Sequence, residues 1–311
     1  MRTENNDKNE GPMNTTDMHI PSNKVRDIER YFHQQLDRQY GPDEVKAMVG
    51  IVFEAFLGWN TTALLLHRDD TVNQSDLLRF HWAVEDLKQW RPIQHIVGWS
   101  EFCGCRIDVD QSTLIPRPET EEIVDWTIKK ISNLTSATTP FKALDLCTGS
   151  GCIAIALAKH LTQLQVTAID ISAEALSKAR HNAAVNNVEI DFRQDDILSP
   201  QFTLEDSRFD LIISNPPYVM LSEKETMNRN VLDWEPHSAL FVPDDDPLRF
   251  YRTIARTAEK HLKDSGIVIV EINEQLGLKT AELFEEYGFY TKVHRDFREH
   301  DRMLTATKHI E

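Results

Sequence analysis

Short apolar runs alternate with longer helical patterns from residue 141 to the C-terminus, and this alternation constrains the fold more than any other feature. The apolar, β-like runs are residues 143–146, 166–169, 189–194, 209–214, 267–272, 290–294 and 303–307. Helical patterns occur at residues 153–160, 173–186, 248–262 and 276–287. Because strands that are separated by helices pair side by side in a parallel sheet, the sequence predicts an α/β fold.

The residues that precede this region follow other patterns. The first twenty residues are polar and predict a disordered tail. Apolar side chains then recur at three- and four-residue spacing, which indicates helices, until Arg91-Pro92 interrupts them. Short β-like runs with glycine turns follow, and two prolines lead into a helix over residues 120–132. The predicted segments are a tail (1–20), an N-terminal helical domain (21–91), a β-hairpin connector (92–119) and an α/β domain (120–311).

Composition excludes several classes of protein. No window approaches 18 uncharged apolar residues, and the polar N-terminus lacks the apolar core of a secretory signal, so we expect a cytoplasmic protein without a membrane partner. The net charge is −16, from 50 acidic and 34 basic residues. Direct nucleic-acid binding is therefore not expected, since phosphate recognition needs a cationic face. Four cysteines without CxxC spacing or a histidine cluster predict no metal site.

The segment from Asp145 to Gly151 has the pattern of a nucleotide-binding turn between a strand and a helix. Gly149 and Gly151 permit close approach of a ligand, and the following helix offers free N–H groups. Asp170, after the next strand, is placed to accept hydrogen bonds from a ribose. A dinucleotide and S-adenosylmethionine both fit this pattern. Asp145 favours S-adenosylmethionine, since its carboxylate can face the ligand's ammonium group. The remaining candidate ligand contacts are Cys147, Thr148 and Ser150 in the turn, and Asp195 or Asp196 for the adenine amino group.

An apolar strand ends abruptly in Asn215-Pro216-Pro217-Tyr218, which we interpret as the catalytic motif. Two prolines remove two N–H donors and fix φ, so the Pro216 carbonyl is free beside the side-chain carbonyl of Asn215. Two fixed acceptors can hold both hydrogens of a planar NH₂ group, and Tyr218 can stack on its plane. Such acceptors strengthen their bonds as positive charge develops on the nitrogen during methyl transfer. The motif suits an adenine amino group and a glutamine amide equally, and a rigid turn without chemistry is the third interpretation.

Several motifs in one order resemble the HemK/PrmC family of N5-glutamine methyltransferases that modify peptide chain release factors. They are Pro92–Gly98, Ile115-Pro-Arg-Pro-Glu-Thr-Glu121, Asp145–Gly151, Ser214–Tyr218, Glu235–Leu240 and Asp301-Arg302. The resemblance implies a Rossmann-like class I S-adenosylmethionine-dependent methyltransferase with a seven-stranded mixed sheet. It implies transfer of a methyl group to the glutamine of the Gly-Gly-Gln motif in class 1 release factors, leaving S-adenosyl-L-homocysteine. Asn215 to Tyr218 would hold the glutamine amide, Asn215 would touch both ligands, and Arg117 and Glu119 would help to close the site.

The chain departs from this family in two places. Cys147 stands where the family usually has glycine, so we expect its backbone to avoid strongly positive φ. Residues 243–248 differ from the family's glycine-containing run, which changes that turn. The core motifs leave three alternatives: methylation of a ribosomal-protein glutamine, N6-adenine methylation of nucleic acid, and a silent S-adenosylmethionine-binding protein.

Overall fold

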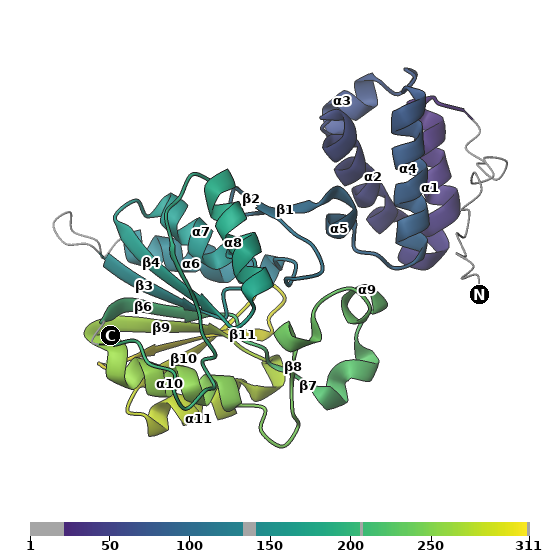
Figure 1. Ribbon diagram of the computed structural model, residues 1–311. Coiled ribbons are helices and arrows are strands. Elements are labelled where there is room, and N and C mark those ends of the chain that lie inside the picture. The colour runs from purple at the N-terminus through teal and green to yellow at the C-terminus, as the bar shows by residue number, and fades with distance from the viewer. Residues whose placement is uncertain (1–21, 133–140, 206–207, 310–311) are drawn as a thin grey trace, which may run out of the picture. The chain divides into compact units, whose positions relative to one another are not determined.

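A computed structural model describes residues 22–132, 141–205 and 208–309 (Figure 1). The predicted disordered tail, residues 1–20, lies outside the described residues. The chain divides into two compact units between Val97 and Gly98. Each unit has its own hydrophobic core.

The first unit is helical and contains α1 (Val25–Tyr40), α2 (Pro42–Leu57), α3 (Thr61–Leu66), α4 (Gln74–Lys88) and α5 (Ile93–Val97). Its core includes Phe32, Phe53 and Phe80, and the rings of Phe53 and Phe80 are 4.4 Å apart. The sequence did not predict α3, because this short helix buries only Leu64 and so shows no apolar periodicity. Residues 93–115 were expected to mix short β-like runs with turns, and for residues 93–97 this was wrong. They form α5 after Pro92, and Ile93 packs into the helical core.

In the second unit, the strands predicted from the sequence form one mixed sheet. The strand order is β10-β11-β9-β6-β3-β4-β5; β11 runs in the direction opposite to the other six strands, which are parallel to one another. The strand bounds are β3 (Phe141–Leu146), β4 (Leu164–Asp170), β5 (Asp191–Gln194), β6 (Phe209–Ser214), β9 (Leu262–Glu271), β10 (Tyr290–Arg295) and β11 (Asp301–Thr307). From β3 the chain continues to β4, on one side of β3, and later returns to form β6 on the other side of β3. This reversal places a ligand site at the carboxyl ends of β3 and β6.

Helices cover both faces of the sheet (Figure 1). On one face lie α6 (Pro118–Ser132), α7 (Cys152–His160) and α8 (Ala173–Val185), and on the other α10 (Arg249–His261) and α11 (Gly277–Glu286). Successive strand residues enter opposite cores: Ala143 packs beneath α7, while Leu144 packs toward α10 and α11. Burial on both faces explains why these strands are continuous apolar runs in the sequence. The predicted class I methyltransferase fold is confirmed.

A two-stranded hairpin precedes α6, as the sequence predicted. It consists of β1 (Trp99–Phe102) and β2 (Cys105–Asp108). Asn182 in α8 and Asn186, which caps the C-terminus of α8, bind the backbone of β2 much as a neighbouring strand would. Asn186 accepts a hydrogen bond from the backbone N–H of Arg106 at 3.2 Å and donates to its carbonyl at 2.7 Å, and Asn182 accepts from the N–H of Asp108 at 2.9 Å.

The segment between the catalytic motif and α10 contains several short elements. These are β7 (Val219–Met220), η2 (Leu221–Thr226), α9 (Arg229–Leu232), η3 (His237–Ala239) and β8 (Phe241–Val242). β7 and β8 pair in parallel, which closes the segment on itself. None of the helices in the described ranges is both long and apolar enough to cross a bilayer.

Candidate active site

A cavity of about 380 Å³ opens at the carboxyl ends of β3, β4 and β6. Its wall includes the turn after β3, Asp170 after β4, Asp195 and Asp196 after β5, and Asn215 and Pro217 after β6. Further parts of the wall come from the segment that leads into α6 and from the segment before β8; they include Gln111, Ser112, Thr113, Leu114, Pro116, Arg117, Thr120, Pro236, Ser238 and Ala239. A broader hollow of about 790 Å³ lies at the opposite, amino-terminal end of the strands, away from every predicted site residue. The predicted residues therefore gather at the sheet edge where α/β proteins bind ligands.

The two glycines of the turn have different physical roles. Gly149 has φ +55°, and a Cβ placed there would meet no atom within 4 Å, so its backbone borders open cavity. Its N–H donates a hydrogen bond to Asp170 Oδ2 at 2.8 Å. Gly151 has φ +80°, and a Cβ there would come within 3.0 Å of the Ala179 Cβ. Gly149 thus permits a close ligand, whereas Gly151 permits the close packing of α7 against α8.

Cys147 corrects one expectation from the sequence. Its φ is +63°, in the left-handed region that the sequence analysis expected it to avoid. The next residue explains the conformation: the backbone N–H of Thr148 donates to the Ile169 carbonyl at 3.0 Å, which holds the turn against β4. Burial raises the pKa of the Cys147 thiol well above its ordinary value, and the nearby Asp170 and Asp145 raise it further. The thiol is therefore protonated and unreactive.

Asp145 lies behind the turn and is absent from the cavity wall. The side chain is fully buried, and its Oδ2 accepts a hydrogen bond from the Thr148 hydroxyl at 2.6 Å. Its Oδ1 has no hydrogen-bond partner within the described part of the chain. Burial raises the pKa of Asp145 to about 7, with the Thr148 hydrogen bond opposing and the Asp170 charge adding. The cavity thus has a second layer, in which a buried carboxyl supports the turn from beneath.

Asp170 is held rigidly at the cavity wall. Gly149 donates to its Oδ2, and the backbone N–H of Ser172 donates to its Oδ1 at 2.9 Å. Burial raises the pKa of Asp170, and these backbone donors oppose the rise. The Asp195 backbone also binds the Asp170 carbonyl, at 3.1 Å, which brings the acidic residues of neighbouring strands together.

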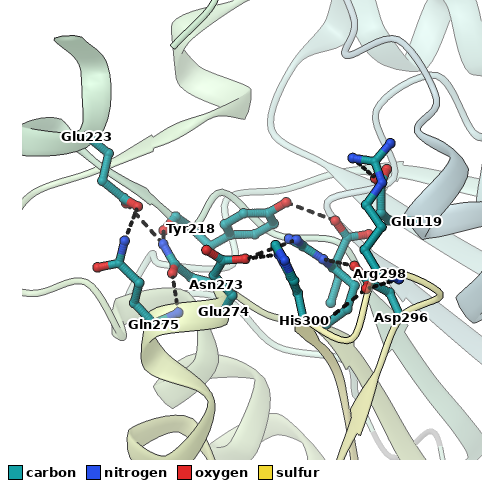
Figure 2. Close-up of polar contacts among 11 residues, drawn as sticks. Glu119, Tyr218, Glu223, Asn273, Glu274, Gln275, Asp296, Arg298 and His300 are labelled. Atoms are coloured by element: carbon teal, nitrogen blue, oxygen red, sulfur yellow. Dashed lines mark hydrogen bonds and ion pairs between the residues drawn. The ribbon is translucent and has the colours of Figure 1, made fainter. Parts of the chain in front are cut away.

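The catalytic motif divides between the cavity and the protein interior. Asn215 and Pro217 line the cavity, whereas Pro216 and Tyr218 do not. Asn215 Nδ2 donates to the Thr120 hydroxyl at 3.1 Å. The Tyr218 hydroxyl donates to Glu271 Oε1 at 2.9 Å, and Figure 2 shows the tyrosine ring directed along that bond. Burial, and then the charge of Glu271, raises the pKa of Tyr218 well above its usual value, so the phenol stays protonated.

The two residues expected to help close the site are separated. Arg117 lines the cavity and pairs with Glu235, Nη2 to Oε1, at 2.5 Å. The second oxygen of Glu235 accepts from the N–H of Ile115 at 2.9 Å, so this buried carboxylate fixes the cavity wall on two sides. Glu119 is not part of the wall; its carboxylate lies 3.6 Å from the Arg298 guanidinium. Figure 2 shows these two side chains directed toward each other.

Sequence reasoning missed Thr120 and Glu271 as site residues, and it noted Glu235 only as a family position. One signal was available for Glu271, which is a charged residue that directly follows the buried apolar run 267–270 of β9. Burial raises the pKa of Glu271, while hydrogen bonds from Thr120 and Tyr218 and the charge of Arg302 lower it. Thr120 gave no signal, because a threonine in the first turn of a helix is commonplace.

The described residues offer no cluster of side chains that suits a metal ion. No group of three or more His, Cys, Asp or Glu side chains there is arranged to hold a metal ion. The four cysteines are free, and Cys103 and Cys105 are buried within the hairpin, in its turn and at the start of β2.

Comparison with known proteins matches both units. The model of the methyltransferase small domain matches residues 129–233, and that of the PrmC N-terminal domain matches residues 29–98. Among solved structures, the hMettl16 catalytic domain, solved with a MAT2A 3′UTR hairpin, has a TM-score of 0.50 at 16% identity. That match covers 79% of this chain and 87% of the other, and it supports the fold alone.

Relatives in two bacteria align with nearly the whole chain. A release factor glutamine methyltransferase of Flavobacterium psychrophilum is 42% identical over 284 residues, covering 90% of this chain and 98% of the relative. One of Bacteroides thetaiotaomicron is 39% identical over 282 residues, covering 90% and 99%. The methyltransferase domain and fold imply that S-adenosylmethionine is the methyl donor. With this fold, cavity and identity, the chain belongs to the family of release factor glutamine methyltransferases.

Proposed function

We propose that this enzyme transfers a methyl group from S-adenosylmethionine to the side-chain amide nitrogen, N5, of the glutamine in the Gly-Gly-Gln motif of class 1 release factors. This modification would modulate translation termination. Because translation is a cytoplasmic process, we expect the reaction to occur in the cytoplasm. The observation that carries the proposal is the position of Asn215. Its side chain lies on the wall of the same cavity as the glycine turn and Asp170. One cavity can therefore hold the donor and the acceptor amide together.

The residues present fit S-adenosylmethionine. Gly149 borders open space, so a ligand can approach the turn's backbone. Cys147 to Gly151 would hold the amino-acid part of the donor, Asp170 its ribose, and Asp195 or Asp196 its adenine amino group. Asp145 is fully buried directly behind the turn, and its carboxyl would serve as an electrostatic counterpart to the donor's ammonium group. When bound, S-adenosylmethionine supplies a methyl group on a positively charged sulfur.

The chain's own residues activate the acceptor by holding it. An amide nitrogen attacks poorly because its lone pair is delocalised. The Asn215 side-chain oxygen and the Pro216 carbonyl would accept its two hydrogens, and those bonds strengthen as positive charge develops on the nitrogen. Fixed alignment of the nitrogen adds the proximity contribution. The proton can leave after transfer, so no strong base is required.

The remaining site residues serve the approach of the substrate. Pro217 would shape the cavity and Arg117 would hold its wall closed. Tyr218 is not part of the cavity wall, so its ring would contact the glutamine amide at the edge of the cavity. We assign Glu119 to the outer margin of the site, because its carboxylate pairs with Arg298 and is not part of the cavity wall. The helical unit and the hairpin are proposed as the N-terminal domain and connector of the enzyme, and the release factor as its protein partner.

Mass spectrometry of a purified release factor tests the proposal. The factor is incubated with the enzyme and S-adenosylmethionine, and the peptide that contains Gly-Gly-Gln should gain one methyl group. Asn215→Ala should abolish the gain while binding S-adenosylhomocysteine. Full turnover by this variant would refute the role of Asn215. No gain by the unaltered enzyme, despite measured donor binding, would refute the release-factor substrate and direct the search to ribosomal proteins and then nucleic acids.

A further inference from the structure

We infer that Thr120 and Glu271 are positioning residues that fix which end of the Asn215 amide faces the substrate. The inference rests on the proposed function in one respect, that Asn215 holds the glutamine amide. An asparagine side chain has nearly the same shape when its amide is turned by 180°, but its oxygen and its nitrogen then exchange places. Only one of these orientations offers an acceptor to a substrate NH₂ group.

The hydrogen bonds run in a single direction from the cavity to the interior. Glu271 accepts two hydroxyl donors, Tyr218 on Oε1 at 2.9 Å and Thr120 on Oε2 at 2.5 Å. The single hydroxyl hydrogen of Thr120 is used in this bond. Its oxygen can therefore only accept from Asn215, and Asn215 Nδ2 lies 3.1 Å away. The Asn215 nitrogen is thereby directed at Thr120, which leaves the side-chain oxygen for a ligand.

The three residues lie on rigid parts of the fold. Thr120 is in the first turn of α6, Glu271 ends β9, and Asn215 follows β6 directly. Thr120 and Glu271 are each 2% exposed. Turning the Asn215 amide would set its oxygen against the Thr120 oxygen and leave a polar group without a partner, which is costly in a buried place. The buried pair therefore selects one orientation before any substrate arrives.

This arrangement has a consequence for specificity. A site that presents only acceptors binds a side chain that donates two N–H bonds and repels one that presents only oxygens. We expect it to accept glutamine and to reject glutamate, although the two side chains have the same shape. Because Glu271 is absent from the cavity wall, its part in this selection is indirect and runs through Thr120.

Substitution of the Thr120 hydroxyl tests the inference. Thr120→Val keeps the shape but removes the hydroxyl, and Thr120→Ser restores it. The matched control is Thr127→Val, on the same helix, where a fully buried hydroxyl donates to the Ile123 carbonyl at 2.7 Å. For each variant we would measure kcat and KM on a Gly-Gly-Gln release factor, the Kd of S-adenosylhomocysteine by calorimetry, and thermal unfolding.

We expect Thr120→Val to lower kcat by about tenfold to a hundredfold, the scale on which small misplacements act. The Kd of S-adenosylhomocysteine should stay within about threefold, and Thr120→Ser and Thr127→Val should retain most of kcat. Unchanged kcat in Thr120→Val would overturn the inference, as would equal losses in Thr120→Val and Thr120→Ser, or a matching loss of S-adenosylhomocysteine binding. These outcomes presuppose turnover by the unaltered enzyme; its absence would instead refute the proposed substrate.

Discussion

The left-handed backbone of Cys147 gives a prediction that separates backbone strain from side-chain packing. With φ at +63°, any side chain at this position brings its Cβ close to neighbouring backbone atoms. The informative comparison is Cys147→Gly against Cys147→Ala. Both variants lose the thiol and its packing against the core under α10, and they differ only in the Cβ that causes the strain.

The magnitude follows from two opposing effects. A left-handed conformation costs an L residue about 1–2 kcal/mol. Glycine removes this cost, but it loses more conformational freedom on folding than alanine does, which costs about 0.5–1 kcal/mol. Cys147→Gly should therefore be more stable than Cys147→Ala by up to about 1.5 kcal/mol, with a central value of about 0.75 kcal/mol. For a folded unit of this size, that difference corresponds to a rise of about 1–4 °C in Tm.

Differential scanning calorimetry measures this difference directly. Because the chain has two units, each variant is scanned with and without S-adenosylhomocysteine, and the transition that the ligand raises is assigned to the catalytic unit. Urea unfolding gives the free energy independently, provided that the slopes agree between the variants.

Cys152 supplies the matched control, since it begins α7 and has ordinary helical backbone. There the order should reverse, and Cys152→Gly should be less stable than Cys152→Ala. If Cys147→Ala is as stable as Cys147→Gly, the strain argument is refuted. If glycine is favoured at both positions, the effect does not come from the conformation at residue 147.

Three further predictions concern carboxylates around the cavity. Burial raises the pKa of Asp145 to about 7, so the folded protein keeps a proton that the unfolded chain loses near pH 4. The stability that this group contributes therefore falls as pH rises from 4 to 7. Over that range, the stability of Asp145→Asn should increase relative to that of the unaltered protein. Urea midpoints of the two proteins that shift by the same amount between pH 5 and 7.5 would contradict this. Asp170→Asn should weaken S-adenosylhomocysteine binding by roughly 10- to 100-fold, since hydrogen bonds to charged acceptors contribute about 1.5–3 kcal/mol; an unchanged calorimetric Kd would exclude the ribose role. Glu235→Gln removes the charge that pairs with Arg117 and should cost about 1 kcal/mol of stability, a modest value because Arg117 is partly exposed. An unfolding midpoint equal to that of the unaltered protein would show that this pair does not stabilise the cavity wall.

Local sequence carried enough information to predict most of the catalytic unit. Its strands are buried on both faces, so each is an unbroken apolar run that can be recognised without knowing its neighbours. Strand β6 was predicted with the bounds Phe209–Ser214 that the structure has. α3 and α5 were missed for the opposite reason, because each is short and has too few buried positions to show a period.

The sequence by itself determined which residues could carry the chemistry, and only the tertiary structure decided how they are used. The glycine turn, Asp170 and Asn215 each follow a strand, and parallel strands bring their carboxyl ends to one edge, so their convergence could be predicted. The depth of Asp145 behind the turn, the strained backbone of Cys147, and the link from Asn215 through Thr120 to Glu271 could not. Thr120 and Glu271 are separated by 151 residues, and their hydrogen bond exists because the fold buries both. Burial and pairing across such separations depend on the packing of the whole unit, and no local pattern records them.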